Sequence, residues 1–251
     1  MSLRLGRWLA TLPGLSDFPL KVAFARWELL EGQPDELAFA FEELCQRVDA
    51  AEEASRAALL AFVPVLVDPE NLAPIQGVRL AAREACLPAV SRLLRCSSRQ
   101  GHRLDSPEPV DKEERALTLG ERRALARKPS RAQLAKLLSD PHPMVAQILL
   151  ANPRLTESDV VAMAARRPAI AKVMVEIAKS WCRRPRVRMA LVLNPTAPPA
   201  VSIPLLGLLA RPELREVSRA ADLLPVVRVT ASEQWELRPP LRALAPPEQL
   251  N

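Results

Sequence analysis

One stretch of this chain returns in altered form 42 positions later, and it limits what the chain can fold into. The segments are Pro141–Leu155 ("PHPMVAQILLANPRL") and Arg183–Ala197 ("RRPRVRMALVLNPTA"), and each places a proline nine residues before an Asn-Pro pair. Proline fits the first turn of a helix, where its missing N–H would be unpaired anyway, and it disfavours α geometry in the residue before it. The pattern therefore predicts a short helix with a defined start and stop. We interpret it as a repeated building unit rather than a duplicated catalytic motif.

Other helix boundaries in the second half of the chain are marked in the same local way. Three hydroxyl residues are each followed, three positions later, by an acidic or amide residue, which is the spacing of a capping box. The pairs are Thr118 with Glu121, Ser130 with Gln133, and Thr156 with Asp159. At the helix stops, Asn152 and Asn194 precede proline, and asparagine tolerates the left-handed conformation that ends many helices.

Alignment on the prolines reveals further, weaker copies of the unit. Apolar residues follow the prolines mainly at positions +2, +5 and +6, and the prolines are spaced by 25, 17 and 27 residues. Short helices of this kind bury their apolar side only by stacking on neighbours, which is the logic of a solenoid. The residues are Val145, Ile148 and Leu149 after Pro143; Ile170, Val173 and Met174 after Pro168; Val187, Ala190 and Leu191 after Pro185; and Leu214 and Val217 after Pro212.

The segments Asp140–Pro168 and Arg183–Pro212 resemble the leucine-rich repeat variant, a bacterial relative of HEAT and armadillo arrays. In that family an Asp-Pro pair and an apolar helix are followed by Asn-Pro and a second leucine-rich helix. The resemblance covers about residues 117–225 and implies a right-handed α-solenoid, but it implies no particular activity. Some members hold an iron–sulfur centre in a cysteine cluster. This chain has no such cluster, so that cofactor is not carried over.

The first half of the chain is also predicted to be helical, because alternating β-branched runs are missing throughout. The N-terminus is interpreted as a first helix rather than a secretion signal. Val22, Trp27 and Leu30 mark a second helix. Between Pro34 and Phe62 a three–four apolar spacing predicts one long amphipathic helix. Another is predicted for Leu72–Leu94, entered through Pro74 and kinked at Pro88.

Composition divides the chain into modules. Residues 1–110 carry a net charge of −3 and residues 111–251 a net charge of +9, which suggests that an anionic partner meets the second half. The segment around 97–112 is polar, contains glycine and proline, and has no helical stripe. We therefore predict an all-α protein with four parts: a helical N-terminal module (1–96), a linker (97–112), a right-handed α-solenoid of short degenerate repeats (113–236) and a proline-rich tail (237–251).

Several kinds of chemistry are disfavoured by the sequence. The cysteines, Cys45, Cys86, Cys96 and Cys182, show no C-x-x-C spacing, and His102 and His142 complete no metal pattern with them. Buried, reduced thiols in the cytoplasm are the simplest interpretation. No glycine-rich phosphate loop is present, and no apolar run approaches the roughly 18 residues of a membrane span. We expect no catalytic residue, no cofactor and no metal.

The most suggestive functional feature is the placement of arginines around the prolines of the repeat. In a last helical turn they would offset the helix dipole on a solvated surface. In a solenoid they would instead align along one edge as a basic rim for an acidic protein surface or a phosphate backbone. The rim residues are Arg166, Arg167, Arg183, Arg184, Arg186, Arg188 and Arg211, with Arg127-Lys128 as a fourth basic pair.

The leading functional hypothesis is a non-enzymatic bacterial scaffold that binds another protein with an acidic surface. A nucleic-acid-binding HEAT-like module is the alternative, although only Trp181 and Trp235 offer aromatic rings for base stacking. A HEAT-like DNA glycosylase ranks lower, because its tryptophan and aspartate cannot be placed on this chain.

Single residues have simpler interpretations. Trp181 is expected to anchor helix packing and His142 to be a lone turn residue. The carboxylates Glu42, Glu43, Glu52 and Glu53 are expected to be solvated.

Overall fold

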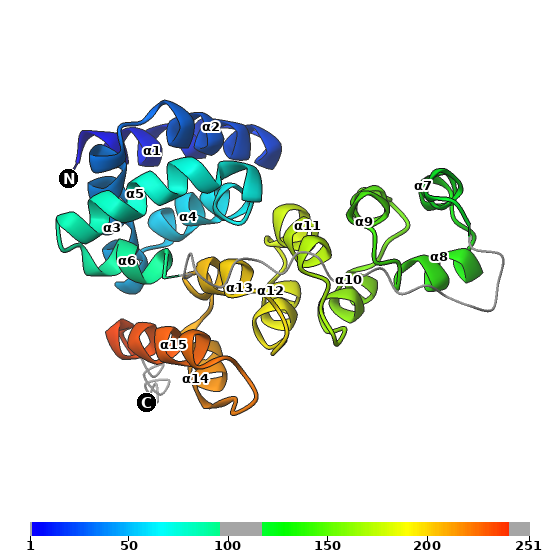
Figure 1. Cartoon of the computed structure of the whole chain (residues 1–251). Coiled ribbons are helices and arrows are strands. Elements are labelled where there is room, and N and C mark those ends of the chain that lie inside the picture. Colours follow the sequence, from blue (N-terminus) through cyan, green and yellow to red (C-terminus); the bar gives the residue numbers. More distant parts are fainter. Residues whose placement is uncertain (1, 96–116, 241–251) are drawn as a thin grey trace, which may run out of the picture.

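The structure, a computed structural model, describes residues 2–95 and 117–240. Within those ranges the chain forms fifteen α-helices and one short 3-10 helix, without any strand (Figure 1). The prediction of an all-helical protein is confirmed for the described residues. The predicted linker at 97–112 and most of the predicted tail at 237–251 lie outside them.

The first seven elements form an N-terminal unit around an aromatic core. Trp8, Phe41 and Phe62 are fully buried, and their ring centroids lie 4.5 to 5.1 Å apart. Such tilted and edge-on ring contacts add to the free energy of burial. The elements are α1 (Leu3–Gly14), α2 (Phe18–Glu31), α3 (Pro34–Asp49), α4 (Glu53–Leu66), η1 (Pro69–Asn71), α5 (Leu72–Glu84) and α6 (Pro88–Leu93).

Two helices predicted as single elements, the second with a kink at Pro88, are interrupted in the structure. The stretch Pro34–Phe62 breaks after Asp49 because Ala51 adopts a φ of 63°, and the Glu52 N–H donates to the Arg47 carbonyl 3.0 Å away. Leu72–Leu94 breaks in the same way at Cys86, whose φ is 53°. Left-handed residues with such a bond close many helices, usually at glycine. The apolar spacing continued through both breaks and concealed them.

The remaining helices form an array in which short helices alternate between two rows (Figure 1). In one row α9 packs between α7 and α11, and in the other α10 packs on α12. The helices are α7 (Leu119–Arg127), α8 (Arg131–Leu137), α9 (Pro143–Leu150), α10 (Glu157–Ala164), α11 (Ala171–Trp181), α12 (Pro185–Val192), α13 (Pro199–Leu206), α14 (Arg211–Arg219) and α15 (Pro225–Leu237).

Most of the predicted helix boundaries are confirmed. Capping boxes are present at Thr118, Ser130 and Thr156, and Pro143 and Pro185 begin α9 and α12. Pro168 departs from the pattern, because it lies three residues before α11 and follows a cis peptide bond. The register of apolar residues holds at Val145 and Leu149, which are fully buried.

Asn152 and Asn194 end their helices without a left-handed conformation, since neither has a positive φ. Their side chains instead join successive layers of the array. The Asn152 amide donates to the carbonyls of Ala126 and Arg127 at the end of α7, at 3.3 and 3.4 Å. The Asn194 amide donates to the carbonyls of Ala164 and Arg166, both at 2.8 Å, after α10. Each asparagine thus pairs helix-end carbonyls that have no partner within their own helix.

The N-terminal unit packs against the C-terminal part of the array and not against α7, where the array begins. Helix α4 contacts α11 and α13 (Figure 1), and Arg56 donates to the Leu208 carbonyl at 2.7 Å. Gly207, at the end of α13, permits this approach, because a Cβ atom there would lie 2.6 Å from Leu59 Cδ2. The junction between the two parts therefore joins residues more than a hundred positions apart.

Replacing Leu149 by alanine should lower the free energy of unfolding by about 2–5 kcal/mol, because a fully buried side chain is lost and a cavity remains. The neighbouring Gln147 is exposed, so Gln147→Ala should change it by less than about 0.5 kcal/mol. Urea denaturation of the two variants measures both values. Similar small effects at the two positions would contradict the register of the array.

Asn194→Ala should destabilise the protein by on the order of 1–3 kcal/mol, because the buried Ala164 carbonyl and the partly buried Arg166 carbonyl lose their donor. Asn194→Asp keeps the acceptor for the Thr196 N–H but removes both donors, so it should be at least as destabilising. Thermal and urea unfolding test this pair. If aspartate restored wild-type stability, the asparagine would be serving the local turn and not the joining of layers.

Candidate partner-binding surface

The contacts of the array define two edges, at opposite ends of its helices. The Asn152 edge contains the turns after α7, α9 and α11, joined by the Asn152 contacts and by the Trp181 indole, which donates to the Leu150 carbonyl at 3.1 Å. The Asn194 edge contains the turns after α8, α10, α12 and α14. Helix α9 has eight residues, so the edges lie about 12 Å apart along its axis.

The seven predicted rim arginines are divided between these edges, so they do not form one stripe. Arg166 and Arg167 follow α10 and belong to the Asn194 edge. Arg166 donates to the Ser139 carbonyl, and Arg167 lies 3.5 Å from the Leu193 carbonyl and 3.4 Å from the Asp222 carboxylate. Both side chains thus already contact neighbouring layers. The other five rim residues follow α11 or α13.

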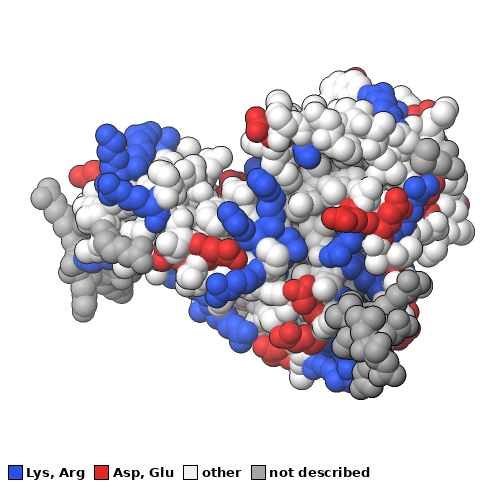
Figure 2. Space-filling model, turned by 180° about the vertical axis from the view of Figure 1, so that it is seen from behind, with Lys and Arg blue, Asp and Glu red and all other residues white. Residues whose placement is uncertain are grey.

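Arg183, Arg184 and Arg186 form an exposed basic cluster on the Asn152 edge, at the start of α12. All three side chains are exposed, and none pairs with a carboxylate in the described part of the chain. Arg183 lies over the Phe18 ring of α2, with 5.1 Å between its guanidinium carbon and the ring centroid. We call these three residues the α12 arginine cluster. Figure 2 shows Lys and Arg side chains gathered across the middle of the rear face, between the array and the bulk of the molecule.

The dipole explanation applies only to Arg183, which follows the C-terminal end of α11. Arg184 is the N-cap of α12 and Arg186 lies in its first turn, where the positive end of the helix dipole disfavours cations. Arg188, one turn further, has a structural contact, since it donates to the carbonyls of Cys182 and Arg183 at 2.9 and 3.2 Å. Burial lowers the pKa of its guanidinium. Arg211 begins α14 and lies over the Trp235 ring, 5.0 Å from the centroid.

A second feature, unforeseen from the sequence, is a groove between the N-terminal unit and the array. It has a volume of about 390 Å³. One wall comes from the end of α4, η1, α5 and the end of α6, and the other from the starts of α9, α11 and α13. The lining is mostly apolar and includes Val67, Ile75, Leu94, Val175 and Val201. Concave apolar sites at junctions between units are the usual form of a binding site.

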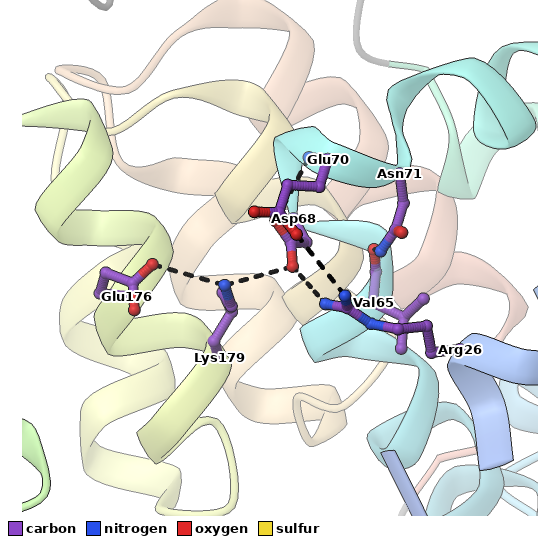
Figure 3. A network of polar contacts seen from close by, with 7 residues as sticks. All are labelled: Arg26, Val65, Asp68, Glu70, Asn71, Glu176 and Lys179. Atoms are coloured by element: carbon purple, nitrogen blue, oxygen red, sulfur yellow. Dashed lines mark hydrogen bonds and ion pairs between the residues drawn. The ribbon is translucent and has the colours of Figure 1, made fainter. Parts of the chain in front are cut away.

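Asp68 lies at the centre of this junction (Figure 3). Its carboxylate is 2% exposed and accepts from Arg26 of α2 at 2.5 Å, while Lys179 of α11 lies 3.2 Å away. It also accepts from the Glu70 N–H at 3.3 Å and so caps η1. Asn71 fastens the same turn by donating to the Val65 carbonyl at 2.9 Å. One buried carboxylate therefore ties α2, η1 and α11 together.

The other residues singled out from the sequence have structural contacts. Trp181 anchors helix packing as expected, and His142 caps α9 by accepting from the Met144 N–H at 3.2 Å. The expectation for Glu42 is wrong: it is buried and caps α6, accepting from the N–H groups of Ala89 and Val90 at 2.8 and 2.9 Å. Its position on the helix wheel could not show that α6 begins against it. Glu43 likewise accepts from the Ser2 N–H at 2.7 Å.

No group of three His, Cys, Asp or Glu side chains in residues 2–95 and 117–240 could hold a metal ion. Cys45 and Cys182 are buried free thiols, and burial raises the pKa of both, to about 12 for Cys182. Cys86 is exposed, and Cys96 and His102 lie outside the described residues.

Comparisons with family profiles, curated proteins and solved structures gave no significant match. Among the described helices, no single one is long and apolar enough to cross a membrane; only the sharply bent pair Glu53–Leu66 and Pro69–Glu84 meets those criteria together.

Asp68→Ala should destabilise the protein by about 1–3 kcal/mol, because Arg26 and Lys179 lose a charged acceptor and η1 loses its cap. The two cations are partly exposed and can regain water, which limits the loss. Urea denaturation measures the effect, and proteolysis should become faster at the junction. Glu70→Gln is the control. Its carboxylate is 77% exposed and lies 3.6 Å from Arg26, so stability should stay nearly unchanged.

Proposed function

We propose that this protein is a non-enzymatic scaffold whose helix array is a right-handed α-solenoid of the leucine-rich repeat variant kind. It binds an acidic surface of another protein in the cytoplasm through the α12 arginine cluster, Arg183, Arg184 and Arg186. The repeated layers of helices hold this cluster in place. Helices of seven to eleven residues are held by asparagine contacts that recur with the repeat, so the turns between them are presented in a fixed geometry.

The α12 arginine cluster carries the proposal because the stability of the fold explains only part of it. Three guanidinium groups lie within four positions without a carboxylate partner among the described residues. Arg183 follows the end of α11 and contacts the Phe18 ring, but Arg184 and Arg186 lie at the positive end of α12. The mutual repulsion of the three groups and the α12 dipole act against the folded state. An acidic partner would relieve both effects, and the planar guanidinium binds carboxylates through two parallel hydrogen bonds.

A second candidate, nucleic-acid binding, is favoured by one observation on α14. Arg211, Arg215 and Arg219 follow one another at four-residue spacing and line a hollow of about 520 Å³ with Trp235. An arginine row beside an indole suits phosphates and a stacked base. Glu216 lines the same hollow, and its negative charge would repel a phosphate group. Phosphate contacts also predict a steep loss of affinity with salt, which separates the two candidates.

Replacing Arg183, Arg184 and Arg186 together by glutamine should weaken binding of a fluorescently labelled polyglutamate peptide by about tenfold or more, measured by fluorescence anisotropy. The melting temperature should stay nearly unchanged, because removing cations from a helix N-terminus offsets the loss of the Arg183 contact with the Phe18 ring. Single-stranded DNA of similar charge serves as the second probe.

The matched control removes three exposed arginines elsewhere, Arg83, Arg127 and Arg154, for the same change in net charge. Polyglutamate binding should be affected much less in this control. Equal losses in both triple variants would show that net charge alone attracts the peptide, and the proposal would fail. Tighter binding of DNA than of polyglutamate, with a steep salt dependence, would favour the nucleic-acid candidate instead.

A further inference from the structure

We propose that the groove between the N-terminal unit and the array is a second docking site, for a short partner segment that carries apolar side chains and a carboxylate. The proposal rests on the proposed scaffold function and names the kind of segment that the scaffold binds. It follows from three properties of the groove: its apolar lining, the pairing of its acidic residues, and its position along α11.

The lining of the groove is apolar on both walls and is accessible from solvent. Leu72 at the start of α5 remains 46% exposed although it lines the groove. Five prolines line it as well, and they present apolar surface without N–H groups: Pro69, Pro143, Pro198, Pro199 and Pro204. Burial of this surface by a partner segment would contribute roughly 25 cal/mol per Å² of apolar area.

The charges around the groove favour an acidic segment over a basic one. Each acidic residue in the lining already has a cation: Asp68 contacts Arg26 and Lys179, Glu70 lies near Arg26, and Glu176 lies 3.4 Å from Lys179 (Figure 3). Lys172, by contrast, is exposed and has no carboxylate partner among the described residues. One cation at the mouth is thus free to meet a carboxylate of the partner.

The backbone around Lys172 adds to the same preference. Helices α9, α11 and α13 all begin at the groove, through Pro143, Ala171 and Pro199. None of the three has an acidic residue in its first turn, and α11 and α13 have no side-chain cap. The positive ends of three helix dipoles therefore lie beside Lys172 and reinforce its attraction for a carboxylate.

The shape of the groove suits a peptide segment. Lys172, Val175, Glu176 and Lys179 line it at the spacing of one helix face, so the wall formed by α11 is about 10 Å long. An extended segment of about three residues spans that length. The groove is bounded by two units of one chain, so a segment inserted there would also hold the N-terminal unit and the array together.

The test uses the full-length protein and labelled peptides of about ten residues, measured by fluorescence anisotropy. The first peptide contains leucine and glutamate, the second has alanine in place of leucine, and the third has lysine in place of glutamate. We expect the leucine–glutamate peptide to bind at least about tenfold more tightly than either of the others.

Lys172→Glu should weaken binding of the leucine–glutamate peptide by about tenfold and tighten binding of the leucine–lysine peptide, because the unpaired charge is reversed. Lys128→Glu is the matched control: Lys128 is an exposed lysine at the end of α7, away from the groove, and should leave the preference unchanged. Ala200→Trp places an indole in the groove and should abolish binding while circular dichroism shows an intact helical fold.

Two results would overturn the proposal. One is equal binding of the leucine–glutamate and alanine–glutamate peptides, or unchanged binding in both groove variants. The other is binding that emerges only when residues 98–114 are replaced by a Gly/Ser linker of equal length, which would identify this chain's own segment as the occupant. Neither result bears on the α12 arginine cluster, which all these variants keep. Failure of the groove and failure of the proposed function are therefore distinguishable.

Discussion

The helices of the array have seven to thirteen residues, which is too short for them to be stable alone in water, and the array depends on how they are held by their neighbours. Burial supplies most of that support, through residues such as Leu149 and Ile177 that are fully inaccessible. Burial is not directional, however, and would allow neighbouring helices to slide. The Asn152 and Asn194 amides remove that freedom, because each binds particular helix-end carbonyls in the preceding layer. The repeated Asn-Pro pair therefore specifies the register of the layers as well as the end of a helix.

The junction between the N-terminal unit and the array depends on a different balance, between the cost of burying a charge and the ion pairs that offset it. A buried carboxylate such as Asp68 is costly unless it is paired, and its two cations come from α2 and α11, which belong to different units. The pairing therefore favours one relative position of the units over others of similar apolar contact. Glycine at position 207 completes the fit, since α13 could not otherwise approach Leu59 of α4 so closely. The groove exists because this position leaves the starts of α9, α11 and α13 uncovered.

Local signals in the sequence were sufficient for most helix boundaries and for the absence of strands. Thr118, Ser130 and Thr156 cap the helices they were expected to cap, because a capping box involves only four consecutive residues. The breaks at Ala51 and Cys86 were not predicted, since alanine and cysteine are not residue types that commonly adopt a left-handed conformation. The groove and the Asp68 contacts could not be predicted, because they join residues such as Asp68 and Lys179 that are distant in sequence. The arginines were recognised as unusual, but their division between two edges required the direction of each helix.

The α12 arginine cluster is best understood by comparing it with the arginines that the fold uses. Arg188 donates to two carbonyls, Arg238 is buried against Leu209 and Gly207, and Arg56 reaches Leu208; each loses hydration in exchange for defined acceptors. Arg183, Arg184 and Arg186 keep their hydration and have no carboxylate partner among the described residues. At the N-terminus of α12 their charges raise the free energy of the folded state by a few tenths of a kcal/mol each. This destabilisation is small compared with the stability that the asparagine-linked layers give to the array. It also leaves Arg184 and Arg186 without a carboxylate partner among the described residues, while Arg183 lies over the Phe18 ring.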